Sequence, residues 1–223
     1  MKTVNWVLLF GYRVLIVSLF LILTSSANAQ FFEGNVTYAF ETRNGDPNTF
    51  TDSLYNLMYK DAPAISYTYY YKGNKYKSLT SSDPKRVQIY EPSENKIYSY
   101  TEGDEVAFWS EWSKEAKIEK IGKTETILGI ECSAVLMKST NIELTLYYPN
   151  HPAVYKIDAS KLNETNAWEK ILMATGSVPL KFIIKNAEAL HVIVLTATSI
   201  TEEKLDDDVF AIPNFKQVIK RPF

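Results

Sequence analysis

Apolar and polar residues alternate along most of the chain after its first thirty residues. Two runs show this most clearly, with apolar side chains at Val36, Tyr38 and Phe40 and at Tyr67, Tyr69 and Tyr71. A period of two residues is typical of a β-strand that turns one face to a core. Tyrosine and phenylalanine, which are abundant here, favour strands over helices. The pattern therefore predicts a β-rich protein.

Short turns join these runs. Gly73-Asn74 separates the tyrosine run from residues 75–81 and predicts a tight hairpin. Further strands are predicted at 86–90, 96–100, 106–109, 117–121, 127–137, 141–148, 180–185 and 190–200. In 141–148, one face carries Ile142, Leu144, Leu146 and Tyr148. Gly129 lies inside the run 127–137, where we expect a bulge or a close backbone contact.

Two segments have helical character. Asn163 is expected to cap a helix over 164–174, and Gly176 is expected to close it. A weaker helix is predicted to begin at Asn48 or Thr51 and to include Leu54, Leu57 and Met58. No stretch repeats at a fixed period.

The short connections favour an antiparallel sheet, because each parallel pair would need a long crossover. We expect about nine or ten strands, and a sheet of that size curls or closes. The predicted fold is a half-open antiparallel barrel with one or two helices over its concave face, which forms an apolar pocket. Candidate pocket residues are Val36, Tyr38, Phe40, Tyr67, Tyr69, Leu144 and Leu146.

The first 29 residues have the organisation of an export signal. Lys2 and Arg13 precede the apolar run 14–23, and Ala27-Asn28-Ala29 forms a cleavage site before Gln30. The run is shorter than a membrane-spanning helix. We therefore expect residues 1–29 to be a signal peptide and residues 30–223 to be a single exported domain without an integral membrane segment. The expected location is the periplasm, the outer membrane or the outside of the cell.

The net charge argues against nucleic acid as a partner, and the single cysteine limits the available thiol chemistry. Lys2 and Arg13 are two of the 24 basic residues, so the predicted mature domain has 26 acidic residues against 22 basic ones. An acidic balance does not attract nucleic acid. Cys132 is the single cysteine and has apolar neighbours, so a buried and inert thiol is expected.

No set of residues specifies a reaction. His151 and His191 are the only histidines; the first lies in a turn, the second in a strand, and no nucleophile motif accompanies them. We therefore expect no catalytic residues, no metal site and no cofactor. Asp206-Asp207-Asp208 could contact calcium, but a solvated turn is the favoured interpretation because the spacing of a calcium loop is absent.

Several motifs in the second half carry a resemblance. They are the segment 124–132 (TETILGIEC), the following strand 142–148, Gly176 with Pro179-Leu180, and the ending 208–213 (DVFAIP). These resemble a family of secreted bacterial domains of unknown function, whose architecture is similar to that of periplasmic lipoprotein carriers and receptors of the LolA/LolB kind. The resemblance implies an unclosed antiparallel barrel that holds acyl chains under helices. It transfers no functional residue to this chain.

Three hypotheses about function follow. The first is a non-enzymatic envelope protein that binds a lipid, a lipoprotein acyl chain or a peptide in the half-barrel. The second is an interaction module with a filled interior and an envelope protein as partner, in which Tyr70 and Trp112 are contact residues. The third and weakest is a hydrolase that acts on envelope polymers through carboxylates. The segment 208–215 is expected to close the core as the last strand.

Overall fold

The computed structural model describes residues 31–44, 65–140, 142–151, 155–158, 160, 162, 164–186 and 191–221. The predicted signal peptide and the helix predicted near residues 48–58 lie outside the described residues. All described residues belong to one compact unit, Phe31–Phe223. Its strands are β1 (Glu33–Asn44), β2 (Ser66–Lys72), β3 (Lys75–Thr80), β4 (Arg86–Glu91), β5 (Lys96–Thr101), β6 (Val106–Glu111), β7 (Lys117–Ile127), β8 (Ile130–Lys138), β9 (Ile142–Pro149), β10 (Lys181–Asn186), β11 (His191–Glu202) and β12 (Gln217–Lys220).

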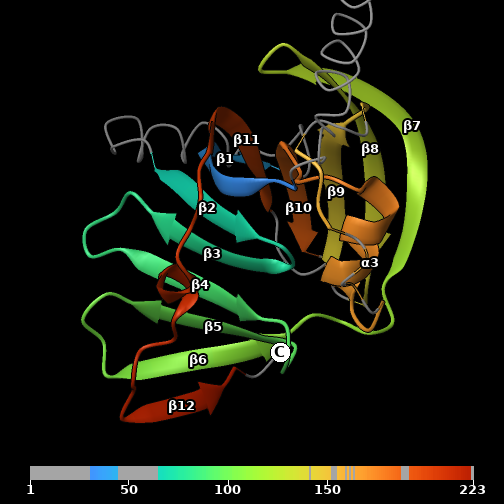
Figure 1. Cartoon of the computed structure of the whole chain (residues 1–223). Coiled ribbons are helices and arrows are strands. Elements are labelled where there is room, and N and C mark those ends of the chain that lie inside the picture. Colours follow the sequence, from blue (N-terminus) through green and yellow to red (C-terminus); the bar gives the residue numbers. More distant parts are fainter. Residues whose placement is uncertain are drawn as a thin grey trace, which may run out of the picture. The chain divides into compact units, whose positions relative to one another are not determined.

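These strands form a single open sheet in the order β12-β6-β5-β4-β3-β2-β1-β11-β10-β9-β8-β7. Neighbouring strands are antiparallel except for β12, which runs parallel to β6. Figure 1 shows β12 and β6 at one end of the sheet and β7 at the other. The predicted mainly antiparallel half-barrel is confirmed. The sheet has twelve strands rather than nine or ten. The predictions missed β12 and placed the break between the strands 117–121 and 127–137, whereas β7 and β8 are divided at Leu128-Gly129.

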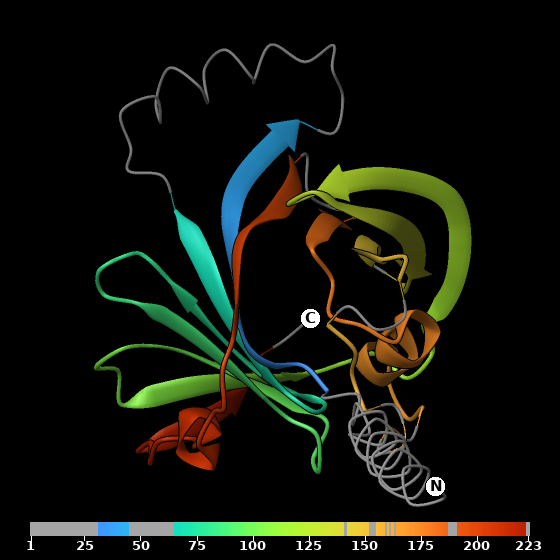
Figure 2. The ribbon, with the colours of Figure 1, turned by 45° about the horizontal axis from the view of Figure 1, so that its top comes forward.

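The connection from β6 to β7 forces the sheet to curl. β6 and β7 are ten strand positions apart in the sheet, which would be about 48 Å in a flat sheet. The five residues Trp112–Ala116 that join them reach at most about 20 Å. The two ends of the sheet must therefore approach each other, as Figure 2 shows. We call this segment, Trp112–Ala116, the seam connection.

A single described α-helix, α3 (Ala167–Thr175), lies on the concave side against β7 and β8. Asn166, rather than the predicted Asn163, is its N-cap, and its side chain accepts a hydrogen bond from Glu169 N at 3.1 Å. Gly176 ends the helix in a left-handed conformation, as predicted. The helix begins later because Asn166 and Glu169 have the three-residue spacing of a capping motif.

Two loops differ from the predictions. Leu128 and Gly129 both have positive φ and form the turn between β7 and β8, so Gly129 makes a hairpin rather than a bulge. The register shift in β7 lies instead between Lys120 and Thr124. Near the C-terminus, Asp207–Phe210 forms a 3₁₀ turn, called η2, and Gln217–Lys220 is the last strand. The predicted final strand over 208–215 is therefore wrong, because the three aspartates start a helical turn.

Gly34 in β1 is the glycine that the sheet most clearly requires. Its φ is 151°, and a Cβ built there would lie 2.0 Å from the carbonyl oxygen of Thr201 in β11. Any larger residue would collide with backbone rather than with a movable side chain. The glycine lets β1 and β11 approach closely in the middle of the sheet.

Aromatic side chains fill the concave side next to α3. Trp168 of α3 stacks on Tyr71 and packs edge-on to Tyr76, with ring centroids 6.4 Å and 5.2 Å away. Its indole nitrogen donates to Asn74 O at 3.2 Å, which ties the helix to the predicted hairpin. Trp112 of the seam connection also stacks on Trp168, with ring centroids 6.0 Å apart.

The hydroxyl of Tyr38 connects this aromatic core to the loop before β10. It donates to Pro179 O at 2.7 Å and lies 3.2 Å from the hydroxyl of Tyr71. Burial raises the pKa of Tyr38 and holds the pKa of Tyr71 well above its ordinary value. Burial also raises the pKa of Tyr69 to about 12. The interior therefore favours neutral tyrosines.

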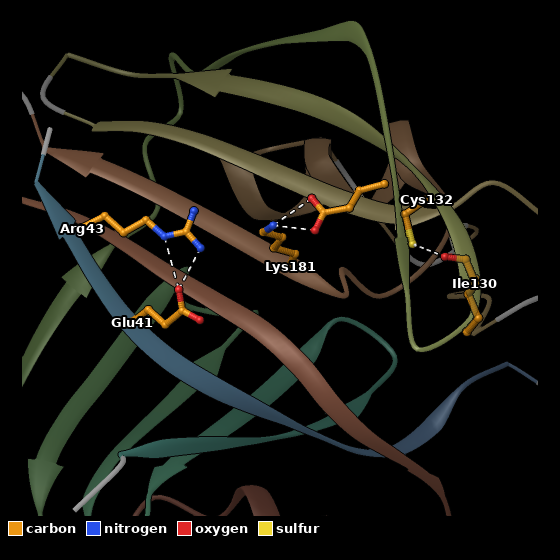
Figure 3. Close-up of polar contacts among 6 residues, drawn as sticks. Glu41, Arg43, Ile130, Cys132 and Lys181 are labelled. Carbon is orange, nitrogen blue, oxygen red and sulfur yellow. Dashed lines mark hydrogen bonds and ion pairs between the residues drawn. The ribbon is translucent and has the colours of Figure 1, made fainter. Parts of the chain in front are cut away.

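An ion pair joins β7 to β10 on the face of β10 opposite to Phe182. Lys181 Nζ contacts both carboxylate oxygens of Glu125 at 2.7 Å and 2.8 Å, shown as dashed lines from Lys181 in Figure 3. The same Nζ lies 5.4 Å from the ring centroid of Tyr147. Lys181 is 8% exposed. Cys132, which pairs with Glu125 across the hairpin, is buried, and burial raises the pKa of its thiol to about 11. The prediction of a buried cysteine is confirmed.

We predict that Glu125→Gln lowers the free energy of unfolding by about 2–4 kcal/mol, because it leaves a buried ammonium without its carboxylate. Lys181→Met should cost less, because the Glu125 side chain is 37% exposed and retains water contacts. Lys185→Met is the matched control on the same strand; its side chain is 54% exposed, and the expected change is below about 0.5 kcal/mol. Urea unfolding measures all three, and equal losses at Glu125 and Lys185 would contradict the argument.

The buried tyrosines also predict alkaline unfolding. A tyrosine whose folded pKa is raised contributes stability that is present below its unfolded pKa and is lost as the pH rises toward the folded pKa. For Tyr69 this window runs from its ordinary value of 10.0 to about 12. The free energy of unfolding should therefore be smaller at about pH 11 than at about pH 8. Tyr69→Phe should reduce this difference; an unchanged pH dependence in that variant would refute the assignment.

Candidate ligand-binding site

Burial along the inner wall of the half-barrel changes from one end to the other. In β1, Val36 and Tyr38 have no exposed surface, whereas Phe40 and Thr42, further along the same face, are only partly buried. In β2, Tyr71 is 1% exposed, and Tyr69 and Tyr67 are partly buried. The filled end is the one that carries Trp168. The far end of the same apolar wall is covered incompletely.

The incompletely covered end forms a continuous apolar row across the sheet. Ile193 of β11 pairs with Ile184 of β10, Ile184 pairs with Leu144 of β9, and Leu144 pairs with Met137 of β8. Ile193 and Ile184 are partly buried, while Leu144 and Met137 are 4% and 2% exposed. The row therefore runs from the middle of the sheet to the strands that face the seam connection.

A pocket lies where this row meets the seam connection. Its volume is about 380 Å³. We call it the seam pocket; its lining residues are Glu111, Trp112, Ser113, Lys114, Met137, Ser139, Thr140, Ile142 and Ala167. They come from the end of β6, the connection itself, the β8–β9 turn and the start of α3. The pocket therefore lies between the seam connection and the ends of β8 and β9 that meet in their turn.

The walls of the seam pocket are apolar and its edge is polar. Met137 and Ala167 are buried parts of the core, and Ile142 is 40% exposed at the opening. Ala167 N donates to Ser113 O at 2.8 Å, which fixes the start of α3 to the seam connection. Pockets of this size with apolar walls and a few polar groups are typical small-molecule sites.

The two charged residues that line the pocket, Glu111 and Lys114, differ in whether their side chains have a partner. The carboxylate of Glu111 forms an ion pair with Lys220 of β12 at 3.6 Å. Among the described residues, the Lys114 side chain has no ion-pair or hydrogen-bond partner, although its carbonyl oxygen accepts a bond from Lys170 Nζ at 2.7 Å. Lys114 is therefore the available charge at this edge.

The seven residues predicted to line a pocket all lie on the inner wall and belong to the core or pack against it. Val36, Tyr38, Leu144 and Leu146 are buried, while Phe40, Tyr67 and Tyr69 are partly buried. None of the seven lines the seam pocket. Burial raises the pKa of Tyr67, and Arg86 opposes this shift. Ligand binding by these residues stays a prediction.

Sequence reasoning missed the residues of the seam pocket. Trp112 was expected as a contact residue of an interaction module, and Met137, Ile142 and Ala167 were expected only as members of strands and a helix; all four line the seam pocket. The available signal was the short stretch between β6 and β7, which limits how far apart the ends of the sheet can lie.

Other chemistry-bearing residues do not gather in the described part of the chain. His151 lies in an exposed turn and His191 begins β11. Asp206, Asp207 and Asp208 are exposed, and Asp207 pairs with Lys72 at 3.1 Å. The described residues contain no group of three or more histidine, cysteine or acidic side chains placed to hold a metal ion.

Another pocket, of about 320 Å³, has two acidic residues in its lining, Glu102 and Asp104 of the β5–β6 turn. None of the described helices has the length and apolar character to cross a membrane.

Several solved structures are similar to this chain at low identity. PNGF-II in the C2 space group has 14% identity and a TM-score of 0.45 over 84% of this chain, which spans only 31% of that protein. An uncharacterized conserved protein from Thermus thermophilus has 11% identity and a TM-score of 0.43, with 92% and 99% of the two chains covered. A LolA superfamily protein from Nitrosomonas europaea has 11% identity and a TM-score of 0.39, with 81% and 90% covered.

Sequence comparison assigns the family. No curated protein matches the chain. A family model described as a domain of unknown function matches residues 76–214, which includes the motifs at 124–132 and 208–213. The match begins in β3 and ends before β12, so it contains both the seam connection and α3. The expected relation to a family of domains of unknown function is confirmed, and the chain belongs to the family Domain of unknown function (DUF4412).

Proposed function

We propose that this protein is an exported, non-catalytic protein of the cell envelope that binds an apolar or amphiphilic ligand on the inner wall of its half-barrel. The observation that carries the proposal is the partly buried row through Ile193 and Ile184, which ends in the seam pocket. Export is supported by the signal-like pattern of residues 1–29. A lipid or an acyl chain of a lipoprotein is the ligand class that fits best.

The energetics of such binding need no reactive group. Burying an acyl chain yields about 0.8 kcal/mol per methylene, so an apolar wall alone supplies useful affinity. The same wall costs stability when it faces water, because the protein keeps apolar surface uncovered there. A ligand that covers Ile184 and Ile193 would remove that cost.

The filled end of the barrel supports a second candidate, an interaction module without a ligand. Trp168, Trp112 and Tyr71 pack tightly there, as such a module requires. However, Tyr70 and Trp112, the contact residues expected for a module, are both partly buried. The incompletely covered end of the wall favours ligand binding over the module.

The test is binding of the uncharged apolar fluorophore N-phenyl-1-naphthylamine to protein stripped of lipid, together with mass spectrometry of an organic extract of the purified protein. We predict binding to the parent protein and at least about a threefold weaker affinity for Ile184→Ser, which removes apolar area from the wall.

Lys185→Ser is the control for this experiment. It changes the next residue of β10 on the opposite face, where Lys185 is exposed and pairs with Glu143 at 3.4 Å, so its fluorophore affinity should match that of the parent. If neither fluorophore nor extracted lipid is found, or if the two variants lose affinity equally, ligand binding on the inner wall is ruled out and the interaction module is favoured.

A further inference from the structure

We infer that the seam pocket takes a single-chain amphiphile with a carboxylate head, such as a free fatty acid, and that Lys114 binds this carboxylate. The inference rests on the proposed function and specifies its ligand. It differs from binding of a lipid with two or more chains. Three observations support it: the size of the pocket, its position in the sheet and the charges at its edge.

The volume of the seam pocket limits how many acyl chains the ligand can have. A cavity of about 150 Å³ holds benzene, which corresponds to about 25 Å³ for each carbon atom. The seam pocket, at about 380 Å³, therefore accommodates on the order of 15 carbon atoms at the same density. One acyl chain fills it, and a second chain of similar length has no room.

The arrangement of buried and exposed lining residues determines how an acyl chain enters the seam pocket. The floor is formed by Met137 and Ala167, which are 2% and 0% exposed, and the opening is marked by Ile142 at 40%. The apolar end of the ligand would contact the floor, while its head would remain at the opening beside Ser139 and Thr140. Both residues supply hydroxyl groups that can donate to a carboxylate oxygen.

Charge selects the head group. Glu111 is paired with Lys220, and Glu115, which follows Lys114 in the seam connection, does not line the pocket. Lys114 is exposed and, within the described part of the chain, its ammonium has no partner. Lys170 Nζ donates a hydrogen bond to the carbonyl oxygen of Lys114 at 2.7 Å, which places a second positive charge beside the seam connection. These charges favour an anionic head over a neutral or cationic one.

The inference is tested by equilibrium dialysis of radiolabelled hexadecanoate and hexadecanol against delipidated full-length protein. Hexadecanoate should bind about twofold to fivefold more tightly than the alcohol at low salt. Lys114→Gln should abolish this preference and leave hexadecanol unchanged, whereas Lys117→Gln, an exposed lysine outside the pocket, should retain it. Ile142→Asp should weaken both ligands at least about tenfold, and Val218→Asp at an exposed position of β12 should weaken neither.

Two results would overturn the inference. One is a preference for hexadecanoate that survives in Lys114→Gln. The other is binding of a two-chain phosphatidylglycerol as tightly as hexadecanoate, with the same sensitivity to Ile142→Asp. If the fluorophore binds and responds to Ile184→Ser but hexadecanoate does not bind, the inference fails while the proposed function stands. If neither binds, both fail.

Discussion

The length of the seam connection is the constraint on which the rest of the structure depends. Trp112–Ala116 joins strands that lie ten positions apart in the sheet, so the sheet can exist only in a curled form. Curling brings the apolar faces of distant strands toward one another and creates an interior. It also leaves a seam, because the end strands approach without hydrogen bonding along their lengths. The seam pocket is the direct consequence.

The interior that results is longer than α3, the one α-helix in the part of the chain that the structure describes. α3 has nine residues and is therefore about 14 Å long, whereas the longest strands have twelve residues and extend about 40 Å. One end of the inner wall is consequently buried under Trp168 and its aromatic neighbours. The other end keeps Ile184 and Ile193 only partly covered. The filled half provides stability, and the incompletely covered half is the surface that we propose binds the ligand.

Much of this fold could be predicted from local patterns. Alternation identified the inner face of β1 and β2, and Gly73-Asn74 identified the hairpin. Leu128-Gly129 was missed because apolar residues on both sides of that turn give the appearance of one continuous strand. Asn163 and Asn166 are equally good caps in isolation; only the spacing to Glu169 distinguishes them.

The site could be predicted only in part, for a physical reason. Alternation shows which side chains share the inner wall, so it found Val36 and Phe40 together, but burial differs between them because of where α3 packs. The seam pocket combines four segments that meet only after the sheet curls. The sequence around Met137 and around Ala167 does not indicate that these two residues line the same pocket.

The most direct test of a half-filled, half-open interior is X-ray diffraction from crystals of the protein exposed to xenon gas, which occupies apolar cavities without needing a polar partner. The account predicts xenon on the inner wall between Ile184 and Met137, and none between Trp168 and Tyr76. Xenon beside Trp168, or an inner wall that takes up none, would contradict it.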